Sequence, residues 1–138
     1  MAIFEWDDSI SLNIPVIDEQ HKELLGWIAA LNDAVQKGEG AQAIGDVLLK
    51  LVSYVCLHFE EEERLLLTCN YPDFASHRAE HDGFVKRLQE IQGHFQDGDK
   101  LSRSTLEFMS DWIVTHIRGT DQKYGPLLRA KMSTPAVD

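Results

Sequence analysis

The 138-residue sequence contains only two cysteines, and only 13 lysines and arginines against 23 aspartates and glutamates. Cys56 and Cys69 do not make a disulfide framework, which favours a reducing compartment. The net charge of -10 argues against nucleic acid and anionic membrane surfaces as partners, because both attract basic patches. We therefore expect no nucleic-acid partner and no membrane partner, and no protein partner is indicated.

Long apolar runs and basic leader segments are also missing. No stretch reaches about eighteen consecutive apolar residues, the length at which a membrane-spanning helix is expected. Glu5, Asp7 and Asp8 occupy the region where a secretory signal would carry basic residues. The sequence has no low-complexity tract and no repeat of solenoid period. These absences predict a single soluble domain over residues 1–138, located in the cytoplasm.

Apolar residues recur in alternating steps of three and four along four segments, which is the spacing of one face of an α-helix. The predicted helices cover about residues 17–37, 41–68, 74–96 and 103–118. Gly38 and Gly40 separate the first helix from the second. Pro72, followed by the N-cap candidate Asp73, separates the second from the third.

The fourth helix is expected to begin near Ser102 or Ser104, because the spacing from Ser104 to Glu107 matches a capping box. Beyond this helix, the dipeptide Gly125-Pro126 is expected to break any helical continuation. Residues 119–138 are therefore predicted to form a separate C-terminal segment.

Four amphipathic helices joined by short loops predict an all-α fold, an antiparallel up-down-up-down four-helix bundle. Residues 1–16 carry aromatic and apolar side chains without helical spacing, so they predict an extended N-terminal arm lying across the bundle. In this topology the starts of the first and third helices and the ends of the second and fourth helices lie at the same end.

Polar residues interrupt the apolar seam of every predicted helix at this common end. They are His21, His58, Glu62, His77, His81 and His116. Buried imidazoles and carboxylates are costly unless they are paired, and this many in one core cannot satisfy each other. A metal site resolves the problem. Five imidazoles exceed the four ligands that usually close one structural zinc, so two metal ions are the better count.

Two divalent cations need anionic bridges, and Glu62 is one candidate. The second should come from the end of the fourth helix, where Asp121 is the choice. Asp121 follows His116 by five residues, which on a regular helix is about 140° away, and Thr120 would take the seam position. We therefore predict a local widening or bulge of the helix near Gly119.

These seven residues resemble the hemerythrin family, and its single-domain bacterial members in particular. The matching segments are His21, His-Phe-Glu-Glu-Glu from residue 58, His-Arg-Ala-Glu-His from residue 77 and His-Ile-Arg-Gly-Thr-Asp from residue 116. The resemblance extends to the aromatic arm and to Lys-Tyr-Gly-Pro at residues 123–126. It implies two iron ions with the following ligands: His77, His81 and His116 on one, His21 and His58 on the other, and Glu62, Asp121 and a solvent-derived oxo or hydroxo group bridging both.

The resemblance implies reversible binding of O2 at an open position of the two-histidine iron, for storage, delivery or sensing. Ferritin-like di-iron sites carry more carboxylates and use Glu-x-x-His pairs, none of which occurs in this sequence. The neutral imidazoles favour O2 binding over O–O cleavage, so we do not expect an enzyme. Ile17, Ile113 and Ile117 are candidates to exclude water from the site.

Two alternatives stay open: a di-iron redox enzyme of the peroxidase or nitric oxide reductase type, and the sensory module of a larger receptor. The metal itself is assigned as iron only by the resemblance, because imidazole and carboxylate also suit manganese, zinc or cobalt.

Residues close to the predicted ligands are expected to have structural roles. Glu60, Glu61 and Glu63 fall off the seam and predict a solvated acidic face. Trp112 is expected to pack in the bundle rather than relay electrons. Nothing in the sequence requires Tyr124 to form a hydrogen bond near the site.

Overall fold

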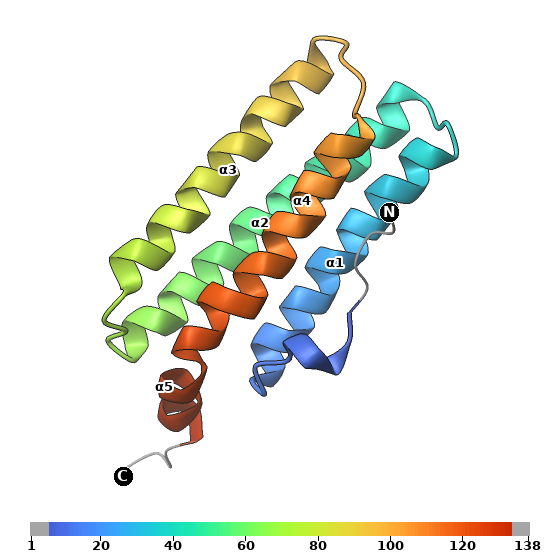
Figure 1. Cartoon of the computed structure of the whole chain (residues 1–138). Coiled ribbons are helices and arrows are strands. Elements are labelled where there is room, and N and C mark those ends of the chain that lie inside the picture. The colour runs from blue at the N-terminus through green and yellow to red at the C-terminus, as the bar shows by residue number, and fades with distance from the viewer. Residues whose placement is uncertain (1–5, 134–138) are drawn as a thin grey trace.

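The computed structural model describes residues 6–133, and this part of the chain contains helices and no strand. The four long helices are α1 (Pro15–Gln36), α2 (Ala41–Thr68), α3 (Phe74–Gln96) and α4 (Arg103–His116). Figure 1 shows them side by side in an up-down-up-down bundle, with α1 packed on α2 and α4, and α2 on α3. The predicted all-α four-helix bundle is therefore confirmed.

The start of α4 differs from the predicted capping box. Ser102 is the N-cap, and its Oγ accepts a hydrogen bond from Thr105 N at 3.1 Å. Ser102 has the extended backbone of an N-cap, whereas Ser104 already lies inside the helix. At the start of α3, Asp73 makes no side-chain capping bond, because its φ and ψ of -95° and 24° are those of a turn.

The prediction that Gly125-Pro126 breaks the chain's helical course is wrong. After α4 the chain continues as a π-helix, η2 (Ile117–Asp121), and then as α5 (Gln122–Ser133), which includes both residues. Pro126 lies inside α5, so the helix continues although proline has no backbone N–H to donate. Burial of Tyr124 and Leu128 anchors the helix. Figure 1 shows α5 set at an angle below α4.

The described part of the N-terminal arm is fixed to the bundle by hydrogen bonds. It contains a short 3-10 helix, η1 (Asp8–Ile10). Asp18 Oδ1 of α1 accepts from Leu12 N at 2.9 Å, and Arg129 Nη1 of α5 donates to the Leu12 carbonyl at 2.5 Å. Residues 1–5 of the predicted arm lie outside the described range.

Helix α2 is long and apolar enough to cross a membrane when judged by length and composition alone. In the bundle its apolar seam packs on α1 and α3, and the same seam holds His58 and Glu62. Only 33% of the apolar stretch that meets this test is buried, and Leu49, Leu57 and Leu67 of α2 are exposed.

Candidate metal centre

The structure brings all seven predicted ligand residues together at one end of the bundle. Every one of them is buried, and none is more than 5% exposed. Their ligand atoms form two adjoining groups that share Glu62, and within each group the atoms lie within 4.8 Å of one another. The antiparallel topology places the residues as expected, because each helix reaches this end of the bundle once.

Asp121 reaches the cluster through the π-helix η2. A π-helix has a wider turn than an α-helix, so a residue five positions after His116 faces the same way as the imidazole. Asp121 Oδ1 accordingly lies 3.1 Å from His116 Nε2. Thr120, the residue that a regular helix would place there, instead donates a hydrogen bond to Glu80 at 3.0 Å. The predicted widening near Gly119 is therefore confirmed.

Glu62 presents its two oxygens to different histidines. Its Oε1 is 2.6 Å from His77 Nε2 and 3.0 Å from His81 Nε2. Its Oε2 is 3.4 Å from His58 Nε2 and 3.7 Å from His21 Nε2. The Glu62 carboxylate thus contacts histidines from α1, α2 and α3.

Asp121 repeats this division with its own two oxygens. Its Oδ1 is 3.2 Å from His77 Nε2 and 3.1 Å from His116 Nε2, whereas its Oδ2 is 3.2 Å from His21 Nε2. The histidines therefore separate into a three-histidine side, facing Oε1 and Oδ1, and a two-histidine side, facing Oε2 and Oδ2. These are the two ligand sets that the resemblance implies, and the ligand roles themselves stay a prediction.

A cation fits the bonding needs of these side chains. Within the described residues, several buried atoms of the cluster have no hydrogen-bond partner: both ring nitrogens of His21, both carboxylate oxygens of Asp121, and Nδ1 of His77 and of His116. Of these, His21 Nε2 and the Asp121 oxygens face one another inside the cluster, whereas the Nδ1 atoms face outward. Buried polar atoms are rarely left unsatisfied in folded proteins. Carboxylate oxygens and Nε2 lone pairs that converge on a common point are the donors that a divalent transition-metal ion requires.

Electrostatics in the cluster favour ionised carboxylates. Burial by itself raises the pKa of Glu62, but contacts with four histidines hold the pKa well below its usual range. Burial lowers the pKa of His21, and its close contacts with the Asp121 and Glu62 carboxylates outweigh it and raise this pKa to about 9. His58, with less compensation for its burial, has a lowered pKa. Protons and metal ions therefore compete for the same imidazole nitrogens.

Three residues outside the predicted ligand set form hydrogen bonds with its members. The Tyr124 hydroxyl of α5 donates a hydrogen bond to Glu62 Oε2 at 3.0 Å. Gln20 Oε1 is 2.6 Å from His58 Nδ1, and Glu63 Oε2 is 2.8 Å from His81 Nδ1.

For Glu63 the predicted solvated role is wrong. Its side chain is only 19% exposed, because this side of α2 faces α3 and the ring of His81. Glu60, in contrast, is exposed as predicted. The seam pattern missed Gln20 and Glu63 because it identifies only one face of each helix, although both residues are sequence neighbours of ligands.

Aromatic rings enclose the three-histidine side. The Phe59 ring stacks on His81 at 3.7 Å between centroids with an angle of 2°. Trp112 stacks on His116 at 4.6 Å and 13°. Trp112 therefore packs against His116, which limits the orientations open to that imidazole.

The four-helix bundle, with its buried histidines and the carboxylates that they share, places this chain in the class of metal-binding helical bundles. Comparison with protein families makes the assignment specific: residues 12–128 match the family described as the hemerythrin HHE cation binding domain. The chain belongs to the hemerythrin family.

Sequences of related proteins align with this chain over almost its full length. The bacteriohemerythrin of Stenotrophomonas maltophilia is 35% identical over 133 residues, which are 96% of this chain and 86% of that protein. The bacteriohemerythrin of Methylococcus capsulatus is 36% identical over 132 residues, 94% of this chain and 100% of that protein. A solved structure of wild-type hemerythrin superimposes with a TM-score of 0.87 at 35% identity, covering 92% of this chain and 98% of that chain.

Proposed function

We propose that this protein binds dioxygen reversibly at a pair of iron ions held by the seven clustered residues. The observation that carries the proposal is the division of the carboxylate oxygens. Glu62 and Asp121 each turn one oxygen to the three-histidine side and the other to the two-histidine side. Two cations that share two bridging carboxylates account for this arrangement, and membership of the hemerythrin family favours iron.

In this proposal the two sides supply different numbers of histidine ligands. His77, His81 and His116 would hold one ion, and His21 and His58 the other, with an oxo or hydroxo group as third bridge. The side with two histidines has one protein ligand fewer, so it offers the position for O2. When bound, such an iron pair supplies the two electrons that O2 accepts on binding and returns on release.

Residues next to this position fix the Glu62 carboxylate and keep the surroundings apolar. Tyr124 donates its hydroxyl hydrogen to Glu62 Oε2, the oxygen that faces the two-histidine side, and so fixes that carboxylate. Ile17, Ile113 and Ile117 are buried one turn or less from ligand residues. Their apolar side chains exclude water, which protects the reduced site from solvent and protons.

We propose binding rather than catalysis, in storage, delivery or sensing. The absence of any Glu-x-x-His pair from the sequence separates the site from ferritin-like di-iron centres. A cytoplasmic location belongs to the same proposal and is supported by the unpaired thiols of Cys56 and Cys69.

The test is anaerobic reduction of the purified protein followed by exposure to air, with visible spectra and an iron count. Two irons per chain and an O2-dependent band that disappears when oxygen is removed are the expected result. Two irons that oxidise at once without such a band would contradict reversible binding and favour a di-iron redox enzyme. Fewer than two irons per chain would contradict the di-iron site itself.

A further inference from the structure

The groups that contact the histidines from outside differ between the two sides of the metal centre. Each imidazole turns Nε2 toward the carboxylates, which leaves Nδ1 facing outward. An acceptor behind Nδ1 fixes the tautomer and orientation of the ring, and a carboxylate acceptor also raises the basicity of the ligand nitrogen. The outer acceptor therefore affects how strongly each side holds a metal ion.

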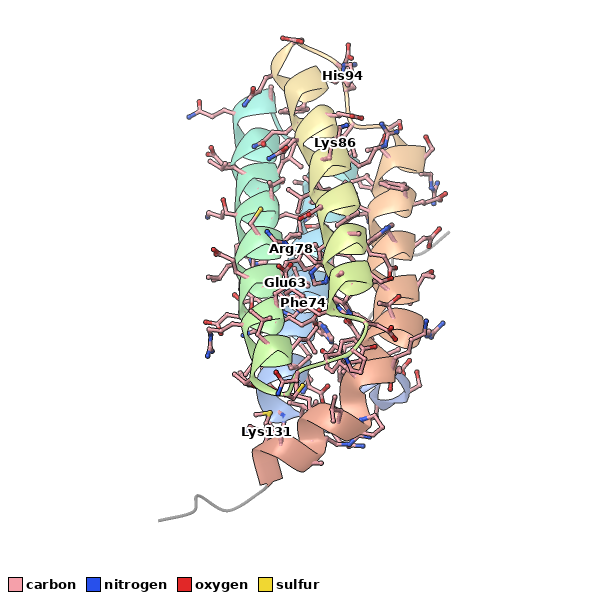
Figure 2. The ribbon with its side chains drawn as sticks, turned by 90° about the vertical axis from the view of Figure 1, so that its left-hand side faces the viewer. Glu63, Phe74, Arg78, Lys86, His94 and Lys131 are labelled. Carbon is pink, nitrogen blue, oxygen red and sulfur yellow. The ribbon has the colours of Figure 1, made fainter. Side chains whose placement is uncertain are left out.

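Glu63 is the outer acceptor on the three-histidine side. Its Oε2 accepts a hydrogen bond from His81 Nδ1 at 2.8 Å. Its other oxygen, Oε1, is 3.7 Å from Arg78 Nε, and Figure 2 shows Glu63 of α2 and Arg78 of α3 beside each other. The Arg78 side chain is 61% exposed, and at this distance it faces the Glu63 carboxylate as a charge without a hydrogen bond.

A second carboxylate stands on the same side. Glu80 Oε1 is 3.6 Å from His116 Nδ1, which is too long for a hydrogen bond but close for a charge. Thr120 Oγ1 lies 3.0 Å from both Glu80 oxygens and keeps the carboxylate there. The three-histidine side therefore has two outer negative charges.

The two-histidine side has a neutral outer partner. Gln20 Oε1 is 2.6 Å from His58 Nδ1, and an amide oxygen carries no net charge. Nδ1 of His21 has no hydrogen-bond partner among the residues that the structure describes. Gln20 also lines an open cavity of about 720 Å³ together with Glu23 and Tyr54, so its outer edge reaches solvent.

We propose that Glu63 is a positioning residue that makes the three-histidine side the tighter of the two metal sites. The inference rests on the proposed function, because it requires a metal ion on each side. The Glu63 carboxylate strengthens His81 as a ligand, whereas the Gln20 amide only orients His58. The two ions therefore leave in a fixed order, first from the two-histidine side and then from the three-histidine side.

The experiment starts from the reduced, iron-loaded protein and equilibrates it anaerobically with increasing concentrations of a chromogenic Fe2+ chelator. Loss of iron in the parent protein is expected in two steps. Glu63→Gln keeps the size of the side chain and an oxygen acceptor but removes the charge. We expect the tighter step to weaken about ten- to hundred-fold, and the weaker step to stay unchanged. Glu60→Gln is the matched control, because it removes the same charge from an exposed position of α2.

Gln20→Glu is the converse variant and tests the asymmetry directly. It places a carboxylate behind His58, with the open cavity beside it to hydrate the new charge. We expect it to tighten the weaker step about tenfold or more. A residue with a merely structural role would not produce this gain when its charge is changed.

Each outcome has a definite meaning. If Glu63→Gln resembles Glu60→Gln, or weakens both steps equally, the inference is overturned. It is also overturned if Gln20→Glu leaves the weaker step unchanged. A parent protein that carries fewer than two irons would contradict the proposed di-iron function, so the two failures are distinguishable.

Discussion

At the scale of single residues, both sides of the metal centre depend on Glu62 and Asp121. Each carboxylate is fully buried and faces histidines on both sides with separate oxygens. In the proposed di-iron site these two residues should have a larger effect than any one imidazole, because removing either would take a ligand from both ions at once.

We therefore expect Glu62→Ala and Asp121→Ala each to reduce the iron content below two per chain and to abolish the O2-dependent band. Iron analysis of the purified variants measures the effect. Glu60→Ala is the control and should retain both irons, because Glu60 is exposed on the same helix. Full iron loading and normal O2 binding in either ligand variant would refute the bridging assignment.

Tyr124 makes a second prediction at this scale. Its hydroxyl is the donor to Glu62 Oε2, so Tyr124→Phe leaves that oxygen without its only hydroxyl donor in the described part of the chain. A hydrogen bond to a buried charged group contributes about 1.5–3 kcal/mol. We expect Tyr124→Phe to lower the free energy of unfolding by this amount in a urea titration.

Tyr54→Phe provides the comparison for Tyr124, since Tyr54 is only partly buried. It should lower the free energy of unfolding by less than the Tyr124 variant. Equal losses in the two variants would show that contact with Glu62 has no special energetic role.

The clustering of the seven predicted ligand residues could be predicted from sequence, whereas the residues behind them could not. His21, His58 and Glu62 interrupt apolar seams, and a polar residue in a seam is visible in any helical pattern. Gln20 and Glu63 lie off the seams, where a polar residue is ordinary. Only the packing of α2 on α1 and α3 shows that they meet His58 and His81.

At the scale of elements, the predicted bounds of α2 and α3 agree with the structure, whereas the cap of α4 and the course of the C-terminal segment differ. Apolar spacing extends over many residues and locates α2 and α3 well, but a cap depends on the backbone angles of one residue. Ser102 rather than Ser104 caps α4 for this reason. The widening at η2 was predictable because the chemistry demanded a carboxylate at Asp121 and regular geometry did not supply it.

The cap of α4 can be tested with a matched pair. Ser102→Ala removes the acceptor for Thr105 N and should destabilise the protein by about 1 kcal/mol. Ser104→Ala, inside the first turn, should change the free energy of unfolding by a few tenths of a kcal/mol at most. Urea unfolding of both variants measures the two changes. A larger loss of unfolding free energy in Ser104→Ala than in Ser102→Ala would favour the predicted capping box at Ser104.

At the scale of the whole molecule, all three tyrosines of the chain have a raised pKa. Burial, and then a hydrogen bond to Glu23, raise the pKa of Tyr54 to about 12. Burial is also the largest cause for Tyr71 and Tyr124. A folded-state pKa above the unfolded value of about 10 stabilises the folded protein below that pH. This contribution is lost as the pH rises from 10 toward the folded-state pKa.

We therefore expect little tyrosinate absorbance from the folded protein at pH 10, where about half the tyrosines of the urea-unfolded chain should be ionised. Above this pH, stability should fall steadily. An ultraviolet pH titration in the presence and absence of urea measures both states. Half-ionised tyrosines in the folded protein at pH 10 would contradict the raised pKa values.

Removal of iron should also act on the whole molecule. The predicted ligand residues come from all four long helices and from η2, from His21 in α1 to Asp121 in η2. A metal ion that binds only the folded chain stabilises it by about 2.7 kcal/mol when its free concentration is a hundred times its Kd. Chelation should lower the thermal midpoint, and added Fe2+ should restore it. An unchanged midpoint would mean that the ions contribute nothing to folding.

The spread of ligands over all the helices has a consequence for the life of the protein in a cell. A polypeptide that starts after His21 or ends before Asp121 lacks at least one of the seven clustered residues, so a growing or partly degraded chain would hold the proposed ions less well. Iron supply would then govern turnover: chains that find metal escape the proteases that clear unfolded protein, and chains made during iron shortage are removed. Abundance would follow iron availability without any change in gene expression.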